Sequence, residues 1–317
     1  MLKNFSFVLN QPKEIFFVLE IVVLSLAFFT AFFFIWSLIS NKKELKVMNL
    51  KMRSWWIMVL LFMFFMLVSK KMAITGIAFM SFIALREILS SLNLRQSDRQ
   101  TTFCCFAAIP LQFWAAYAGF YGFFIIFIPV IMFIVLPITN FTHGDIKDIT
   151  RSVALIQWSF MLTVFSFSHL AFLFSFPPQS GFSAGNYGLV LYVLFLTQFN
   201  DILQFLWGKS IGKHKILPSV SPNKTWEGFL GGFICTTALG YFFRFLTFFT
   251  PVQAIISGAV ISFAGFTGDL NVSAVKRDIG VKDMGNLIPG HGGIMDRIDS
   301  LSYTSLAFFH LAWYWRT

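Results

Sequence analysis

Long stretches of uncharged, apolar residues constrain this chain more than any other feature. The segment from Phe103 to Phe141 contains no Asp, Glu, Lys or Arg, and it is too long for one helix, because a helix crosses a bilayer in about 20 residues. Over the whole chain, 57% of the residues are hydrophobic and 12% are charged, whereas a soluble domain carries about 25% charged residues. A single aqueous core cannot bury 44 phenylalanines. The sequence therefore predicts a polytopic membrane protein.

The apolar runs predict an all-α fold with about ten transmembrane helices. A turn at Gly119–Gly122 divides the long uncharged segment, and the mixed polarity of the first residues predicts no cleavable signal peptide. We expect N-terminal helices in 1–152 and C-terminal catalytic helices in 153–317, packed as one membrane-embedded unit. The predicted spans are residues 16–39, 55–69, 72–90, 102–118, 121–141, 153–176, 187–206, 227–249, 252–270 and 301–315.

The loops between these spans alternate in charge. One set of loops holds 18 of the 24 Lys and Arg residues, and the positive-inside rule makes that side cytoplasmic. Loops that face anionic lipid then explain the formal net charge of +10 without nucleic acid as a partner. We expect an integral protein of a bacterial inner membrane with these loops in the cytoplasm. The basic loops are residues 41–54, 86–101, 142–152, 207–226 and 271–300.

Carboxylates gather in the last third of the chain, at the ends of apolar runs. Asp201 and Asp269 each close a predicted span; a carboxylate there suggests function, although a solvated helix end explains either residue alone equally well. Asp296 and Asp299 are three residues apart, which places both on one face of a helix. Because neighbouring carboxylates repel each other unless a cation lies between them, Asp269, Asp296 and Asp299 are predicted to bind a hard divalent ion. Mg²⁺ is the preferred candidate.

Glycines and basic residues share this stretch with the carboxylates. The amides of "PGHGG", just before "IMDRID", can approach an anion closely. His291 lies in this polar segment and not in an apolar core, and it is predicted to contact phosphate or pyrophosphate. Carboxylates, glycines and cations in one loop are typical of phosphoryl or nucleotidyl transfer, in which catalysis is mainly positioning and charge neutralisation. The cations available for phosphate oxygens are Lys276, Arg277, Lys282 and Arg297.

A second polar loop, "GKSIGKHKILPSVSPNKTWEG" at residues 208–228, lies on the same predicted side. Its first lysines are explained equally well as an ordinary positive-inside loop. The segment "SPNKT" directly precedes a predicted helix, so Ser221, Thr225 and the helix N-terminus predict a phosphate seat. Lys224 lies inside that segment and adds a cation to it.

These motifs resemble the phosphatidate cytidylyltransferase (CDP-diacylglycerol synthase) family. The family pattern is S, then K-R, four residues, K-D, and later H-G-G, two residues, D-R, one residue, D, and every spacing is kept here. "SPNKTWEGFLGG" and Gly268–Asp269 resemble two further blocks, so the likeness covers about residues 197–300, and hydropathy alone matches the first half. The pattern is filled by Ser273, Lys276–Arg277, Lys282–Asp283, His291–Gly292–Gly293, Asp296–Arg297 and Asp299.

The resemblance implies a magnesium-dependent nucleotidyltransferase of phospholipid biosynthesis. Such an enzyme transfers the cytidylyl group of CTP to phosphatidate in the membrane, giving CDP-diacylglycerol and pyrophosphate. Asp269, Asp296 and Asp299 would bind the metal. The resemblance leaves open whether a second, monovalent cation also binds and whether the protein forms a homodimer. The implied catalytic residues are Asp269, Asp296, Lys276, Arg277 and Asp283. The implied substrate-binding residues are Ser221, Lys224, Thr225, Lys282, His291, Gly292, Gly293 and Arg297.

Three departures from the family pattern leave the lipid acceptor open. Val272 stands where an acidic residue commonly precedes the serine, and Gln204 and Phe205 replace an alanine and a tyrosine. One alternative is a CTP-dependent kinase or cytidylyltransferase that acts on another lipid of the polyprenol type. A cation-coupled transporter is a second alternative, although its acids would lie near the midplane of repeated halves. A non-catalytic lipid-binding scaffold is the third.

Overall fold

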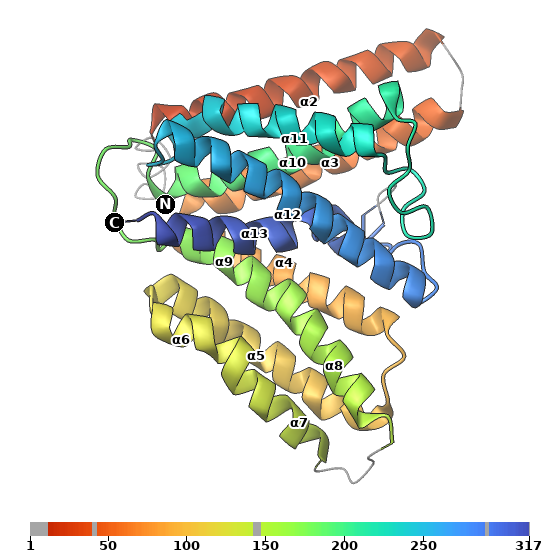
Figure 1. The fold of residues 1–317 in the computed structure, drawn as a ribbon, viewed down its shortest axis with the longest axis vertical. Helices are drawn as coiled ribbons and strands as arrows, with labels where there is room; N and C mark the ends of the chain where they lie inside the picture. Colours follow the sequence, from red (N-terminus) through yellow and green to blue (C-terminus); the bar gives the residue numbers. More distant parts are fainter. Residues whose placement is uncertain (1–11, 40–42, 142–146, 289–291, 317) are drawn as a thin grey trace.

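The structure, a computed structural model, describes residues 12–39, 43–141, 147–288 and 292–316. All the regular secondary structure of these residues is helical, and the loops contain two isolated β-bridges, which confirms the predicted all-α fold (Figure 1). The α-helices are α2 (Lys13–Ile39), α3 (Lys43–Val68), α4 (Lys70–Ser91), α5 (Arg99–Ala118), α6 (Tyr121–Ile126), α7 (Phe133–Phe141), α8 (Ile149–Phe160), α9 (Ser166–Leu173), α10 (Gly185–Ile211), α11 (Trp226–Phe242), α12 (Pro251–Asp278) and α13 (Met295–Tyr314).

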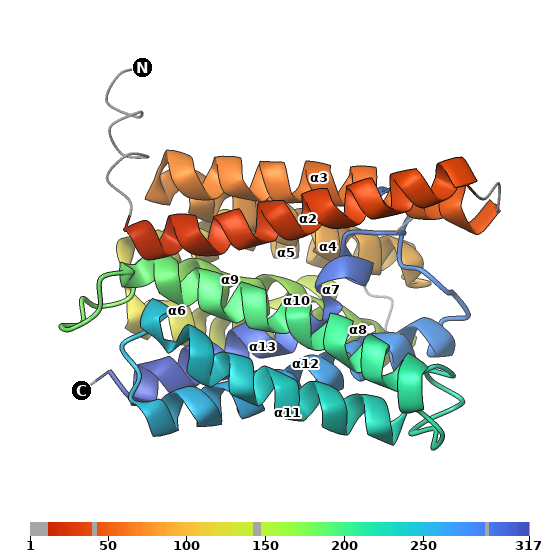
Figure 2. The ribbon, with the colours of Figure 1, turned by 90° about the horizontal axis from the view of Figure 1, so that it is seen from above.

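Nine helical segments of the described residues are long and apolar enough to cross a membrane. They match the first nine predicted spans, with ends that differ by several residues in places. The tenth predicted span, 301–315, falls in α13, which is not among the nine. The structure places α13 inside the bundle, in contact with α12 and α9 (Figures 1 and 2). The nine segments are Lys13–Ser37, Met48–Val68, Lys70–Ser91, Gln96–Ala118, Tyr121–Asn140, Ile149–Leu173, Gly185–Ile211, Trp226–Leu246 and Pro251–Asp278.

Two of these crossings contain a short π-helical segment. The first, η2 (Phe127–Met132), joins α6 to α7 and contains Pro129, which has no backbone N–H to donate to the regular helical ladder. The second, η3 (Met161–Phe165), joins α8 to α9. The turn that divides the long uncharged segment lies at Gly119, which ends α5 in the left-handed conformation with φ of 70°. Here the predicted turn at Gly119–Gly122 is confirmed.

The polar connections gather at one end of the bundle. Figure 1 shows the α4–α5, α10–α11 and α12–α13 connections at the same end, while α2 begins and α13 finishes at the opposite end. This is the arrangement that the alternating loop charges predict. We call the end that carries these three connections the polar end. That the polar end faces the cytoplasm stays a prediction.

Helices α10 to α13 pack against one another, and buried polar side chains link them. The Asn200 side-chain oxygen on α10 accepts hydrogen bonds from Thr236 Oγ1 of α11 (3.1 Å) and Ser262 Oγ of α12 (2.6 Å). Thr197 Oγ1 on α10 donates to Thr304 Oγ1 on α13 (2.9 Å). Such bonds between helices satisfy polar groups that lipid cannot solvate. They hold the four helices in register directly below the polar end.

Candidate active site

Three carboxylates from three helices meet at the polar end of the bundle. Asp201 of α10, Asp269 of α12 and Asp299 of α13 lie close enough to repel one another electrostatically. Ser300 connects two of them, because its Oγ donates to Asp201 Oδ1 (3.0 Å) and its amide donates to Asp299 Oδ1 (2.9 Å). Asp269 and Asp299 belong to the predicted metal set. Asp201, noted in the sequence as the end of a span, joins them in the structure.

A glycine brings two of these acids together. If Gly268 carried a Cβ atom, that atom would lie 3.0 Å from the carbonyl oxygen of Asp299 and 3.1 Å from Cβ of Tyr303. Only a residue without a side chain lets α12 approach α13 this closely. The Gly-Asp pair of the sequence motif therefore works as a unit, in which the glycine sets the helix contact and Asp269 supplies the charge.

Lys224 joins the second polar loop to this acid cluster. Its Nζ lies 2.7 Å from Oδ2 of Asp269, and the two side chains are only 15% and 29% exposed. The same ammonium lies over the ring of Phe266, 4.6 Å from the centroid, and Ser273 Oγ donates to the other Asp269 oxygen (3.1 Å). A half-buried ion pair with further partners holds its geometry better than a pair in water. The "SPNKT" segment and Asp269 are thus parts of one site.

Hydrogen bonds at the start of α11 fix the loop that carries Lys224. Thr225, 3% exposed, is the N-cap of α11, and its hydroxyl accepts a hydrogen bond from the amide of Gly228 (3.1 Å). Glu227 accepts from the amide of Lys213 (3.1 Å) and contacts His214 Nδ1 (2.6 Å), which ties the two ends of the loop together. Thr225 therefore shapes the loop, and its predicted contact with phosphate, like that of the partly buried Ser221, stays a prediction.

Asp296 organises the other polar loop. Its Oδ1 pairs with Lys276 Nζ (3.0 Å), and its Oδ2 accepts hydrogen bonds from the amides of Met284 (2.8 Å) and Gly293 (2.9 Å). The residue is 6% exposed. Both oxygens are therefore engaged by protein donors from the end of α12, the loop and the start of α13. Three donors thus take three of the roughly four lone-pair sites of the carboxylate, so a metal ion would use the remaining site on Oδ1 or replace one of these donors.

Gly292 permits the tight turn beside this carboxylate. Its φ is 84°, which favours glycine, and a Cβ there would lie 2.9 Å from Asp296 Oδ2 and 3.1 Å from Cβ of Asp283. The Ile288 amide donates to the Gly292 carbonyl (2.8 Å). Asp283 is exposed and lies beside Gly292. His291 lies outside the described residues.

The basic residues predicted to bind phosphate differ in their exposure and in the protein contacts that they already make. Lys276 is buried in its pair with Asp296. Arg277 is exposed, and its Nε donates to the Val220 carbonyl (3.3 Å), so it links the two polar loops. Lys282 is exposed. Arg297 Nε is buried without a hydrogen-bond partner among the residues that the structure describes, and a bound anion would satisfy it.

The chemistry of the acid cluster fits a hard cation only in part. Carboxylate oxygens are the ligands that Mg²⁺ prefers, and a cation would relieve the repulsion between Asp201, Asp269 and Asp299. In the described ranges, however, no group of three or more His, Cys, Asp or Glu residues is arranged to hold a metal ion. Lys224 already neutralises one oxygen of Asp269. A metal ion would share Asp269 with this lysine or displace it, and Mg²⁺ stays a prediction.

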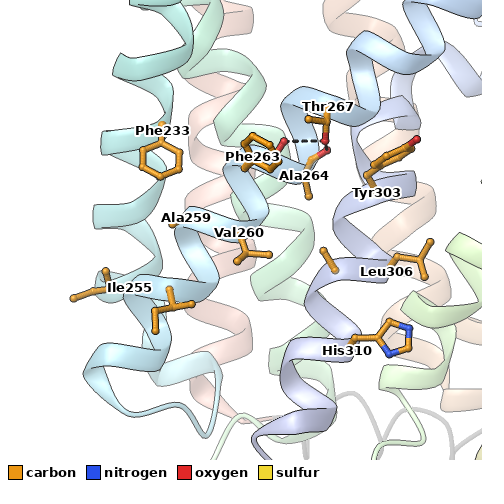
Figure 3. Close-up of a pocket in the computed structure, with 12 residues that line it drawn as sticks. Phe233, Ile255, Ala259, Val260, Phe263, Ala264, Thr267, Tyr303, Leu306 and His310 are labelled. Carbon is orange, nitrogen blue, oxygen red and sulfur yellow. Dashed lines mark hydrogen bonds between the residues drawn. The ribbon is translucent and has the colours of Figure 1, made fainter.

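An apolar groove of about 940 Å³ leads away from this cluster along α11, α12 and α13. Figure 3 shows Thr267 and Tyr303 at one end of the groove and Ile255 and His310 at the other. Tyr303 also packs against Gly268, and its hydroxyl contacts the side-chain nitrogen of Asn271. The groove therefore begins where Asp269 and Asp299 meet and runs along the lipid-facing side of the bundle.

Sequence reasoning missed one residue of this region. Glu87, on α4 in the N-terminal half, contacts the start of α13 beside Asp296. A carboxylate at the end of an apolar span was a signal that could have identified it. The motif match did not reach that part of the chain.

Comparisons with known proteins identify the family of this chain. The Cytidylyltransferase family matches residues 49–315. The uncharacterized protein YnbB of Escherichia coli K12 is 38% identical over 283 residues, which cover 89% of this chain and 92% of that protein. Two proteins named phosphatidate cytidylyltransferase are also similar. That of Mycobacterium leprae is 36% identical over 166 residues, 52% of this chain and 48% of that protein. That of Staphylococcus aureus strain COL is 37% identical over 152 residues, 46% of this chain and 58% of that protein.

The likeness to the named enzymes therefore spans about half of their length, whereas the family match reaches from α3 to the end of α13. That match takes in both polar loops, the three carboxylates and Glu87. The chain belongs to the Cytidylyltransferase family.

Proposed function

We propose that this protein transfers the cytidylyl group of CTP to the phosphate of a membrane lipid and releases pyrophosphate. Phosphatidate is the first acceptor that we propose, with CDP-diacylglycerol as the product. The observation that supports this most is the contact between Lys224 and Asp269. It unites a basic loop and an acid cluster at the polar end of an apolar groove, so that one site offers contacts to phosphates and to a lipid.

The reaction needs no strong base, because the lipid phosphate is already an anion at pH 7. One of its oxygens attacks the α-phosphorus of CTP in line. The bond from that phosphorus to the oxygen bridging to the β-phosphorus breaks, and pyrophosphate leaves with the bonding electrons. Arg277 at the end of α12, Lys282 between α12 and α13, and Arg297 in the first turn of α13 would hold phosphate oxygens and offset the developing charge.

Mg²⁺ would add charge neutralisation at the phosphates when held by Asp269, Asp296 and Asp299. Of these, Asp296 is already engaged by Lys276 and two amides. In the absence of bound substrate, Lys224 compensates the charge of Asp269. We propose that it turns to a phosphate of CTP when the site fills, because an ammonium on a flexible stem can exchange one anion for another.

The groove supports a lipid acceptor. From Ile255 to Thr267, α12 rises about 18 Å, which is close to one leaflet of a hydrocarbon core of about 30 Å. An acyl chain lying there would place its headgroup at the end marked by Thr267 and Tyr303, next to the acid cluster. We therefore propose that the acyl chains of the acceptor lie along this groove.

The departures from the family pattern leave the acceptor as the open part of the proposal. Val272 is fully buried in the hydrophobic core, and Phe205 is 64% exposed on the outside of α10. Neither position offers a group that could take part in the chemistry. Another lipid phosphate, of the polyprenol type for example, is the alternative acceptor.

The test uses the purified protein in detergent with CTP, Mg²⁺ and a panel of lipid phosphates. Release of pyrophosphate that requires both CTP and one lipid supports the proposal and names the acceptor. Asp269→Asn should abolish the release, whereas Asp278→Asn, at an exposed acid on the same helix, should not. Pyrophosphate release without any lipid, or release that Asp269→Asn leaves unchanged, would contradict the proposal.

The polar end also supports a proposal about where the protein is located. The similar proteins named above are bacterial, and CTP is a cytoplasmic nucleotide. We propose a bacterial inner membrane with the polar end in the cytoplasm. A thiol-reactive probe that cannot cross the membrane should label a cysteine at exposed Lys282 only in inverted vesicles. Labelling in right-side-out cells would reverse the orientation.

A further inference from the structure

Glu87 of α4 binds the beginning of α13. Its Oε1 accepts a hydrogen bond from the amide of Ile294 (3.0 Å), and its Oε2 accepts one from the amide of Met295 (2.9 Å). The side chain is 8% exposed. The first amides of a helix have no partner within the helix, and a negative charge there is favoured by the helix dipole. Glu87, on another helix, thus caps α13. Among the described residues, no N-cap side chain of α13 itself makes a capping hydrogen bond.

Two glycines make room for this carboxylate. A Cβ on Gly293 would lie 2.5 Å from Glu87 Oε2, and one on Gly285 would lie 2.8 Å from Oε1. Side chains at these positions would collide with the Glu87 carboxylate. Gly293 belongs to the sequence motif for which a phosphate contact was predicted, and the structure gives it a second reason to be glycine.

A second contact fixes the other side of the same loop. Ser91, one turn beyond Glu87 on α4, donates from Oγ to the carbonyl of Met284 (3.0 Å). The amide of Met284 in turn donates to Asp296 Oδ2, which also receives the amide of Gly293. Helix α4 therefore holds both the middle of the loop and the start of α13, with Asp296 enclosed between them.

We propose that Glu87 is a positioning residue for the proposed cytidylyl transfer, and this inference rests on that function. It holds the first turn of α13 and the glycine turn so that Asp296, and through α13 also Asp299, stand where the phosphates of CTP bind. The N-terminal half thereby contributes to catalysis without touching substrate. A misplacement of about 1 Å at a reacting site costs about 100-fold in rate.

The test compares Glu87→Gln with a matched structural variant. Gln keeps the shape of the side chain, but only one of its two terminal atoms can accept a hydrogen bond, so one amide of α13 loses its partner. Asn140→Ala is the control, because it also removes buried hydrogen bonds, to Asp98 and Arg95, but in the α5–α7 region. We expect kcat of Glu87→Gln to fall about 10-fold to 100-fold, with KM for CTP nearly unchanged, and kcat of Asn140→Ala to stay close to wild type.

A spin label on Leu287→Cys reports the loop without any need for activity. Leu287 is 55% exposed, and Cys104, Cys105 and Cys235 would be replaced by alanine in this background. We expect the label to become more mobile in Glu87→Gln and to keep its wild-type mobility in Asn140→Ala. This measurement tests Glu87 even if the wild-type protein proves inactive with every lipid phosphate, a result that would overturn the proposed function alone.

Two results would overturn the inference. One is a Glu87→Gln variant with wild-type kcat and an unchanged label. The other is an equal loss of kcat in Glu87→Gln and Asn140→Ala at an equal loss of thermal stability, because that would make Glu87 a general structural residue. Glu87→Asp adds a check on length: its shorter side chain cannot reach both amides, so it should lose as much kcat as Glu87→Gln.

Discussion

Lys224 and Asp269 form an ion pair of 2.7 Å that connects the loop before α11 to the membrane-embedded part of α12. The lysine side chain is 15% exposed, and it stands at the centre of the candidate site, between the ring of Phe266 and the acid cluster. The pair joins two motifs that lie far apart in the sequence. It also defines the position at which a phosphate anion would compete with a carboxylate for the same ammonium.

Removal of the ammonium should disable the site. Lys224→Met leaves Asp269 without its cation next to Asp201 and Asp299, and it removes a ligand for phosphate. We expect kcat/KM for CTP to fall at least 100-fold, as the loss of a buried charge contact that costs about 3 kcal/mol would produce. Steady-state kinetics in detergent measures this. Lys213→Met in the same loop, at an exposed position, should stay within about twofold of wild type, and an equal loss in both variants would contradict the role of Lys224.

Asp201 should matter as much as Asp269 and Asp299, although the metal ligands that the resemblance implies do not include it. Asp201→Asn keeps the shape of the side chain but replaces one of the three carboxyl groups of the cluster with a carboxamide. If the cluster binds Mg²⁺, the concentration of Mg²⁺ needed for half-maximal rate should rise about tenfold, because a hard cation loses one carboxylate. Magnesium titrations of the rate measure this. An Asp201→Asn variant with a wild-type magnesium dependence would exclude Asp201 from the metal site.

The close contact of α12 with α13 should be required for activity. Gly268→Ala places a Cβ 3.0 Å from the Asp299 carbonyl oxygen and 3.1 Å from Cβ of Tyr303, and overpacking of this kind costs about 1–3 kcal/mol. We expect a lower melting temperature and a loss of kcat, because Asp269 and Asp299 move apart. Gly122→Ala is the control, since a Cβ there meets nothing within 4 Å. Equal kcat values for the two variants would be inconsistent with this account.

The groove predicts a preference for long acyl chains. Ala259→Trp fills the groove in the middle of α12, away from the polar end. Each CH₂ that loses its place costs about 0.8 kcal/mol, so KM for a long-chain phosphatidate should rise about tenfold when two CH₂ groups are displaced. KM for a short-chain phosphatidate, measured in the same detergent, should not change. Ile234→Trp, at a lipid-facing position of α11 that is 65% exposed, should affect neither substrate.

The sequence was sufficient to predict the spans and the motifs, because each follows from local patterns. An apolar run such as Phe103–Phe141 must cross the membrane, and the spacing of Asp296 and Asp299 follows from helix geometry. The structure confirms the turn at Gly119 and brings Lys224 to Asp269. The metal ligands and the phosphate contacts remain predictions.

Contacts between distant segments could not be read in the same way. Glu87 and Ile294 are 207 residues apart, and no local pattern shows that the end of α4 reaches the start of α13. The engagement of Asp296 by Lys276 and two amides likewise depends on how the loop folds back. The tenth predicted span lies in α13, whose polar first turn shortens its apolar run, and the packing of that helix within the bundle likewise depends on contacts between distant segments.

Cytidylyl transfer is tested most directly by following a radioactive phosphorus placed at either the α or the γ position of CTP. The purified protein would be incubated with Mg²⁺ and phosphatidate, once with α-³²P-CTP and once with γ-³²P-CTP. Cytidylyl transfer predicts that the α-label enters the lipid phase and the γ-label appears in pyrophosphate, and that Asp269→Asn abolishes both. A γ-label in the lipid phase, with the α-label left in soluble CDP, would show a lipid kinase and contradict the account.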